Sequence, residues 1–200
     1  MNAWECDVTI SCVMMTGSLN KCLDLEELSK MMPNSEYHPK RYPHYAVGTK
    51  SFAAIKMTNS SPYVKVSFFS TGTFNVTGAA SVEQTNAGVD AIVERITACP
   101  GFENVVKQEI RVTNIKADAV LNIGNKRVNL GKMVQLRPRY VQYETESFPA
   151  LKLWTDLYKN EKIMVFASGS CNLTGFKDEA SIIVAFKTFY KMFYDKDIFW

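Results

Sequence analysis

The chain lacks the residue patterns that mark metal centres and disulfide frameworks. Its five cysteines include no Cys-x-x-Cys pair, and His38 and His44 are its two histidines. A structural zinc site needs four such ligands at short spacings, so we expect no metal and no bound cofactor. The cysteines are expected to be reduced thiols of an intracellular protein, most of them filling core space.

Long apolar runs and a strong charge of one sign are also missing. No stretch reaches about 18 apolar residues, so no membrane contact is expected. The first residues show no basic region followed by an apolar run, so no signal peptide is expected. The net charge is +3, with 46% hydrophobic residues among 200. These values describe an ordinary globular chain and permit a nucleic-acid partner without arguing for one.

The chain does contain a long internal repeat. Two phenylalanine-bearing hairpins follow one another, and Gly72 and Gly169, like Gly78 and Gly175, are separated by 97 residues. A solenoid needs three or more short units, so this period indicates one compact domain with two pseudo-symmetric repeats. We place the repeats at residues 1–108 and 109–200.

Local patterns predict strand, helix, strands and helix in each half. In the first half, we expect strands at 8–15, 52–58, 63–70 and 73–77, a helix at 25–32 behind Asp24, and a long helix behind Ser81. In the second half, we expect strands at 108–117, 148–154, 161–167 and 171–174, a polar loop after the first strand, and a helix behind Asp178. This order predicts an α+β fold with the helices on one sheet face.

Alternation along the strands separates a core face from an outer face. The outer face of the first copy carries Phe52, Ala54, Lys56, Lys65, Ser67, Phe69, Asn75 and Thr77. The outer face of the second copy carries Phe148, Ala150, Lys152, Lys162, Met164, Phe166, Asn172 and Thr174. Single exposed aromatics need no explanation. Four symmetric phenylalanines among lysines and asparagines suit the DNA minor groove, where lysines neutralise phosphates and apolar wedges unstack bases.

These hairpins and several short blocks resemble the TATA-binding protein family. The matching blocks include Leu23-Asp-Leu25, Ser35-Glu-Tyr37, Phe52-Ala-Ala54, Phe69-Ser-Thr-Gly72, Phe148-Pro149 and Phe166-Ala-Ser-Gly169. The resemblance covers roughly residues 8–195. It implies a saddle-shaped fold whose curved antiparallel sheet has helices on its convex face, and binding in the minor groove, which members of this family kink.

The resemblance assigns roles to individual residues. The two intercalating pairs correspond to Phe52 with Phe69 and Phe148 with Phe166, next to Pro149. Tyr42 competes with Phe52, but the 17-residue gap from Phe52 to Phe69 matches the second copy better. The groove-centre asparagine corresponds to Asn114, and its first-copy counterpart is expected at Thr9. Residues 39–51 then form an insertion, either a further contact for DNA or partners or a solvated loop.

The chain departs from the family pattern around these wedges. Thr73, Ser170, Thr58 and Trp154 stand where the family carries basic residues, and Asn75 and Asn172 replace groove-lining valines. Lys56 and Lys152 are expected to restore phosphate contacts. Asparagines can bond A·T acceptors but tolerate other base edges, so altered preference for TATA-like sequence is expected.

Partner surfaces differ as well. The helix over 81–98 carries Arg95 as its single basic residue, which argues against docking by a transcription factor IIA-like (TFIIA-like) partner. Glu144 and Glu146 match the acidic loop that receives transcription factor IIB in the family, although they also fit solvated surface carboxylates.

The resemblance therefore predicts a non-enzymatic initiation factor, divergent and of viral or eukaryotic origin. It would bind and bend A·T-rich double-stranded promoter DNA and recruit a TFIIB-like factor and RNA polymerase. It would act in the nucleus, or in a cytoplasmic viral factory if viral. The alternative is a scaffold that keeps the fold and binds proteins, with weak or no DNA binding of its own.

Overall fold

The computed structural model describes residues 7–37, 54–136, 140–154 and 160–194, together with residues 196, 198 and 199. The chain forms two compact units, which we describe separately. The N-unit is Cys12–Thr113, and the C-unit combines Met1–Ser11 with Asn114–Trp200. The units differ from the expected sequence repeats because β1 (Val8–Leu19) and β5 (Lys107–Val120) each contribute to both.

The N-unit contains an antiparallel sheet in the order β2-β3-β4-β1-β5. Its strands β2, β3 and β4 are Ala54–Ser60, Tyr63–Phe69 and Thr73–Thr77. Helix α1 (Leu25–Met31) begins at Asp24, whose carboxylate accepts hydrogen bonds from two backbone N–H groups of its first turn. Helix α2 (Val82–Thr97) begins behind Ser81, whose hydroxyl caps the Gln84 N–H. Both expected caps are confirmed.

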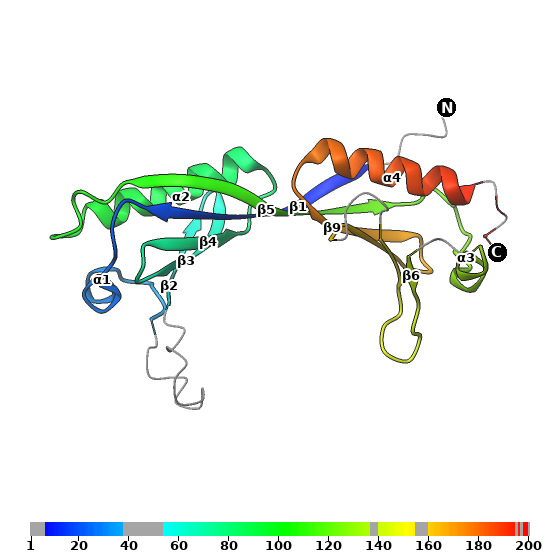
Figure 1. Ribbon diagram of the computed structural model, residues 1–200, viewed down its shortest axis with the longest axis horizontal. Helices are drawn as coiled ribbons and strands as arrows, with labels where there is room; N and C mark the ends of the chain where they lie inside the picture. The colour runs from blue at the N-terminus through cyan, green and yellow to red at the C-terminus, as the bar shows by residue number, and fades with distance from the viewer. Residues whose placement is uncertain are drawn as a thin grey trace. The chain divides into compact units, whose positions relative to one another are not determined.

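Helix α2 packs against β2, β3 and β4, on the face of the strands that is buried (Figure 1). Its apolar stripe is buried at Val89, Ile92, Val93 and Ile96, whereas Val82 is half-buried. The facing strand residues are those expected for the core, namely Ile55, Met57, Val64, Val66, Phe68, Phe74 and Val76, all at most 1% exposed. Period-two alternation therefore located the N-unit core correctly.

The C-unit contains a sheet in the order β5-β9-β8-β7-β6, in which β6 is the short strand Val141–Gln142. Strands β7, β8 and β9 are Leu151–Trp154, Lys162–Val165 and Ser170–Phe176. Helix α4 (Glu179–Tyr194) packs on β9 and lies along one side of this sheet (Figure 1). Its expected stripe of Ile182, Phe186, Phe189 and Phe193 is at most 5% exposed.

Three expectations in the C-unit need correction. The region expected as a polar loop contains helix α3 (Leu130–Gln135) and the short strand β6 (Val141–Gln142). Strand β5 continues past residue 117 to Val120, and β7 begins at Leu151 rather than at 148. Phe148 instead closes a turn, in which its N–H donates to the Glu144 carbonyl at 2.9 Å.

The matched glycines support the internal repeat. Gly72 and Gly169 adopt φ values of 82° and 89°, in the left-handed region that side chains disfavour. Gly72 lies in the turn after β3 and Gly169 in the turn after β8, and the N–H of each donates to the carbonyl of a phenylalanine three residues earlier. The two hairpins therefore share a turn geometry as well as a sequence.

Candidate nucleic-acid interface

Polar side chains of the N-unit form cross-strand rows on the face opposite α2. One row runs through Lys56, Ser67, Asn75 and Thr16, which are paired in register across β2, β3, β4 and β1. The next row runs through Thr58, Lys65, Thr77 and Met14. The sheet therefore brings five of the predicted groove and phosphate residues together, and adds Met14 and Thr16, which the hairpin comparison did not identify.

The C-unit repeats this arrangement. One row runs through Gln142, Lys152, Met164, Asn172 and Asp118, and a second runs through Trp154, Lys162 and Thr174. All five predicted residues in these rows are half-buried. Asp118 was not predicted, because the expected strand ended before it. Its carboxylate accepts a hydrogen bond from the Asn172 amide nitrogen at 2.5 Å.

The second phenylalanine pair is assembled in the C-unit. The ring centroids of Phe148 and Phe166 lie 6.1 Å apart in an edge-to-face arrangement, a favourable geometry for aromatic pairs. The Lys152 ammonium lies 5.1 Å from the Phe148 centroid, a cation–π distance. Both rings are half-buried. An apolar pair with a cation beside it therefore lies at the start of β7 and the end of β8.

Of the first phenylalanine pair, the structure describes Phe69. Phe69 ends β3, is half-buried, and lies in register opposite Ala54. Phe52 and its competitor Tyr42 lie outside the described residues, as does the 39–51 insertion. The assignment of Phe52 remains a prediction.

Asn114 and Thr9, the two residues predicted at the groove centre, have different surroundings. The Asn114 carboxamide oxygen accepts the Gly175 N–H at 2.6 Å and the Thr174 hydroxyl at 3.4 Å, close to a bulge in the β5–β9 pairing. This oxygen is therefore engaged within the C-unit. Thr9 is exposed, and along β1 it alternates with Val13 and Met15, which are buried, and not with Met14 and Thr16 of the polar rows.

Two further residues of the predicted set lie next to Phe148. Pro149 is exposed, whereas Ala150 is 1% exposed. Ala150 therefore offers almost no surface to a ligand. It lies before β7, so the alternation of faces along that strand does not apply to it.

The acidic residues before Phe148 remain accessible. Glu144 and Glu146 are both exposed. The hydrogen bond from Gln142 at 2.8 Å, and then the one from Ser147 at 3.2 Å, hold the pKa of Glu144 below its usual value. Both groups favour the charged carboxylate, so this loop presents negative charge at neutral pH.

The surface of α2 offers little positive charge. Arg95 lies in its last turn, and its guanidinium donates to the Thr58 carbonyl at 3.3 Å. The one basic side chain of this helix therefore makes a hydrogen bond to the backbone of β2.

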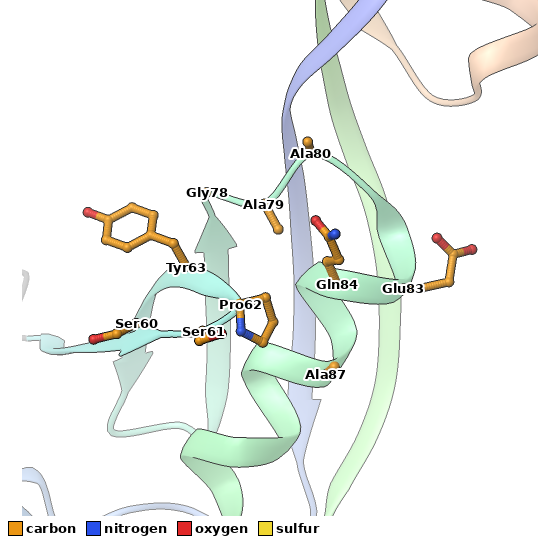
Figure 2. Close-up of a pocket in the computed structure, with 10 residues that line it drawn as sticks. All are labelled: Ser60, Ser61, Pro62, Tyr63, Gly78, Ala79, Ala80, Glu83, Gln84 and Ala87. Atoms are coloured by element: carbon orange, nitrogen blue, oxygen red, sulfur yellow. The ribbon is translucent and has the colours of Figure 1, made fainter.

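A separate hollow lies on the N-unit, between the β2–β3 turn and the first turns of α2 (Figure 2). It is lined by Ser60, Ser61, Pro62, Tyr63, Gly78, Ala79, Ala80, Glu83, Gln84 and Ala87. None of these belongs to the predicted DNA-contacting set, and Glu83 is the one charged residue among them. Across the described ranges, no group of three or more His, Cys, Asp or Glu side chains is arranged to hold a metal ion. No helix in the described part of the chain is long and apolar enough to cross a membrane.

Comparison with known proteins gives a consistent set of relatives. The family model described as "Transcription factor TFIID (or TATA-binding protein, TBP)" matches residues 7–99 and 109–196. The TATA-box-binding protein of Methanocaldococcus jannaschii is 28% identical over 179 residues, covering 90% of this chain and 89% of that protein. The one from Tetrahymena thermophila is 28% identical over 183 residues, covering 92% and 68% respectively.

A solved structure of similar fold agrees. The structure described as "Methanococcus jannaschii TBP" aligns with a TM-score of 0.73 at 26% identity, covering 93% of this chain and 97% of that one. The expected α+β fold class is thereby confirmed.

Proposed function

The chain belongs to the TATA-binding protein family, and we propose that it binds promoter DNA in the minor groove and bends it by inserting phenylalanines. A role in transcription initiation follows from the family. The finer proposal rests on one observation above all: the Phe148–Phe166 pair stands beside rows of lysine, asparagine and threonine on the face that the helices leave open.

The chemistry of this face suits a minor groove. Lys56 and Lys65 of the N-unit, like Lys152 and Lys162 of the C-unit, carry positive charge that can neutralise DNA phosphates. The hydroxyls of Ser67, Thr77 and Thr174 are small enough to approach base edges. Apolar wedges at the end of such a surface would unstack a base step and widen the groove.

We further propose that Glu144 and Glu146 receive a basic surface of a TFIIB-like factor, which in turn recruits RNA polymerase. The support is the exposure of both carboxylates and the hydrogen bonds that hold Glu144 charged. A TFIIA-like partner would meet a single basic residue on α2, Arg95, whose guanidinium also donates a hydrogen bond to the Thr58 carbonyl. The place of action would be the compartment that holds the template, the nucleus or a viral factory.

Selection from random duplexes tests the DNA proposal. We expect enrichment of A·T-rich sites. Replacing A·T pairs of a selected site by inosine·cytosine, which keeps the A·T-like minor groove and changes the major groove, should preserve binding. Loss of binding on this exchange would indicate major-groove readout. Recovery of unenriched sequence would favour the scaffold alternative.

A further inference from the structure

The two asparagines that occupy equivalent positions in the repeats have different surroundings. Asn172 lies in register between Met164 and Asp118, and Asn75 lies in register between Ser67 and Thr16. The C-unit row therefore ends in a carboxylate where the N-unit row ends in a hydroxyl. The repeats differ in charge at this point, although the rest of the row is similar.

The contact between Asp118 and Asn172 fixes which end of the amide faces the carboxylate. A carboxylate accepts hydrogen bonds and cannot donate them, so only the NH₂ end of Asn172 can make the 2.5 Å contact. One of its two amide hydrogens is therefore occupied. The pair as a whole exposes acceptor oxygens and carries a negative charge.

Asn75 is not constrained in this way. Its side chain is exposed and makes no hydrogen bond within the described part of the chain. The neighbouring Thr16 hydroxyl donates instead to the Phe74 carbonyl at 3.1 Å. Asn75 can therefore turn its NH₂ group towards a ligand, and A·T and T·A pairs offer acceptors at the floor of the minor groove.

Asp118 has no cationic partner among the described residues, although it lies on the face proposed to meet DNA. A·T pairs would set their acceptor atoms against its carboxylate, which is repulsive. The exocyclic amino group of guanine is the one hydrogen-bond donor that base pairs present in the minor groove. That group would satisfy the carboxylate and offset the repulsion from nearby phosphates.

We propose that Asp118, together with Asn172, makes the C-unit select a G·C pair at one position, whereas the N-unit accepts A·T around Asn75. This inference rests on the proposed minor-groove function and names the base-pair class that one half of the face recognises. The chain would then bind an asymmetric site, which also fixes the direction in which it lies on a promoter. Asp118 is a specificity-determining residue in this account.

The test compares the full wild-type chain with the Asp118→Asn variant, which removes the carboxylate charge and keeps the shape of the side chain. Each protein is used to select binding sites from random duplexes. The wild type should enrich a G·C pair at one fixed position in one half of the site, and Asp118→Asn should lose that enrichment. Replacing that guanine by inosine removes the amino group alone, and should weaken wild-type binding about tenfold while leaving binding by Asp118→Asn unchanged.

Two control variants separate a local contact from a general charge effect. Glu109→Gln removes an exposed carboxylate from the same strand. Glu109 lies two residues from Lys107, which pairs with Asp90 of α2, so it is on the helix side of the strand. This variant should leave the base-pair preference intact. Thr16→Asp puts a carboxylate in register with Asn75 and should add a second G·C preference in the other half of the site.

The outcomes are distinct. If wild type and Asp118→Asn both bind duplexes and share one preference, the G·C inference is wrong and the minor-groove proposal stands. If the wild type binds no duplex, both proposals are overturned. Circular dichroism of each variant confirms that it is folded before binding is compared.

Discussion

Phe148 and Phe166 lie with their ring centroids 6.1 Å apart and their planes at 61°, although one comes from the turn before β7 and the other directly follows β8. Lys152 adds a cation 5.1 Å from the Phe148 centroid. Edge-to-face contact is a favourable geometry for two aromatic rings, so the two side chains are already together without a ligand. This is the arrangement expected of a wedge that enters a base step.

Removing one ring should therefore impair bending more than folding. Phe166→Ala deletes a half-buried side chain, so its cost in free energy of unfolding should fall below the ~3–5 kcal/mol typical of a fully buried phenylalanine. Duplex bending, measured by energy transfer between end labels, should be largely lost. The matched control is Phe186→Ala in α4, where the ring is 1% exposed, and the stability loss should reach the full range. Equal losses of stability for the two variants would assign Phe166 to the core.

The lysine rows predict a salt dependence of DNA binding. Each phosphate that a lysine neutralises contributes about 0.9 to the slope of log affinity against log salt concentration. Lys65→Gln and Lys162→Gln should therefore each lower the slope by about one. Lys30→Gln on α1, whose ammonium is paired with Glu27 at 2.6 Å, should leave it unchanged. The measurement is a fluorescence anisotropy titration at several salt concentrations. If all three variants kept the wild-type slope, the lysines of these rows would not contact phosphates.

The packing of α2 on β3 predicts a destabilising Gly88→Ala substitution. Alanine is the better helix former by about 1 kcal/mol, but a Cβ at Gly88 would lie 2.5 Å from a Val64 methyl carbon. We expect a net loss of about 1–3 kcal/mol in urea unfolding. Val64→Ala alone should also destabilise, because Val64 is fully buried. The double variant should be more stable than additivity of the two losses predicts, and strict additivity would show that Gly88 is not limited by Val64.

The start of α4 predicts a pH dependence of stability. The Ser181 N–H donates to the Asp178 carboxylate at 2.7 Å, and this bond, followed by the one from the Ser181 hydroxyl, lowers the pKa of Asp178 below its usual 3.8. A lowered folded-state pKa gives stability that is present above pH 3.8 and lost as the pH falls through the folded-state pKa. Asp178→Ala should cost about 1 kcal/mol at neutral pH. Thermal unfolding should show that the difference in stability between the wild type and Asp178→Ala becomes smaller in acid. A difference that does not change with pH would rule out a charged cap.

Much of the outer face could be predicted from the sequence because its hairpin strands are short and regular. Buried and exposed side chains alternate from Ile55 to Met57 and from Val64 to Phe68, and no bulge reverses which face a residue occupies. The prediction was wrong where the expected end of a strand differed from the observed end. Asp118 lies in an Ala-Asp-Ala segment of weak strand propensity, and pairing with β9 is what extends β5 across it.

The remaining differences also have tertiary causes. Helix α3 has six residues, includes Gly131, and is held by the burial of Leu130 and Met133 instead of by a recognisable periodic pattern. Thr9 was assigned by matching repeats, whereas its alternation with Val13 gives the opposite face. Ala150 follows Pro149, which delays the start of β7 and leaves Ala150 buried.

Bending of a labelled duplex tests the central claim most directly. The duplex carries a donor and an acceptor at its two ends and an A·T-rich site selected by the protein, and is titrated at low salt. The account predicts that energy transfer rises on binding because the ends approach one another. Binding detected by anisotropy with no change in energy transfer would contradict it, since phenylalanines that enter a base step must kink the duplex.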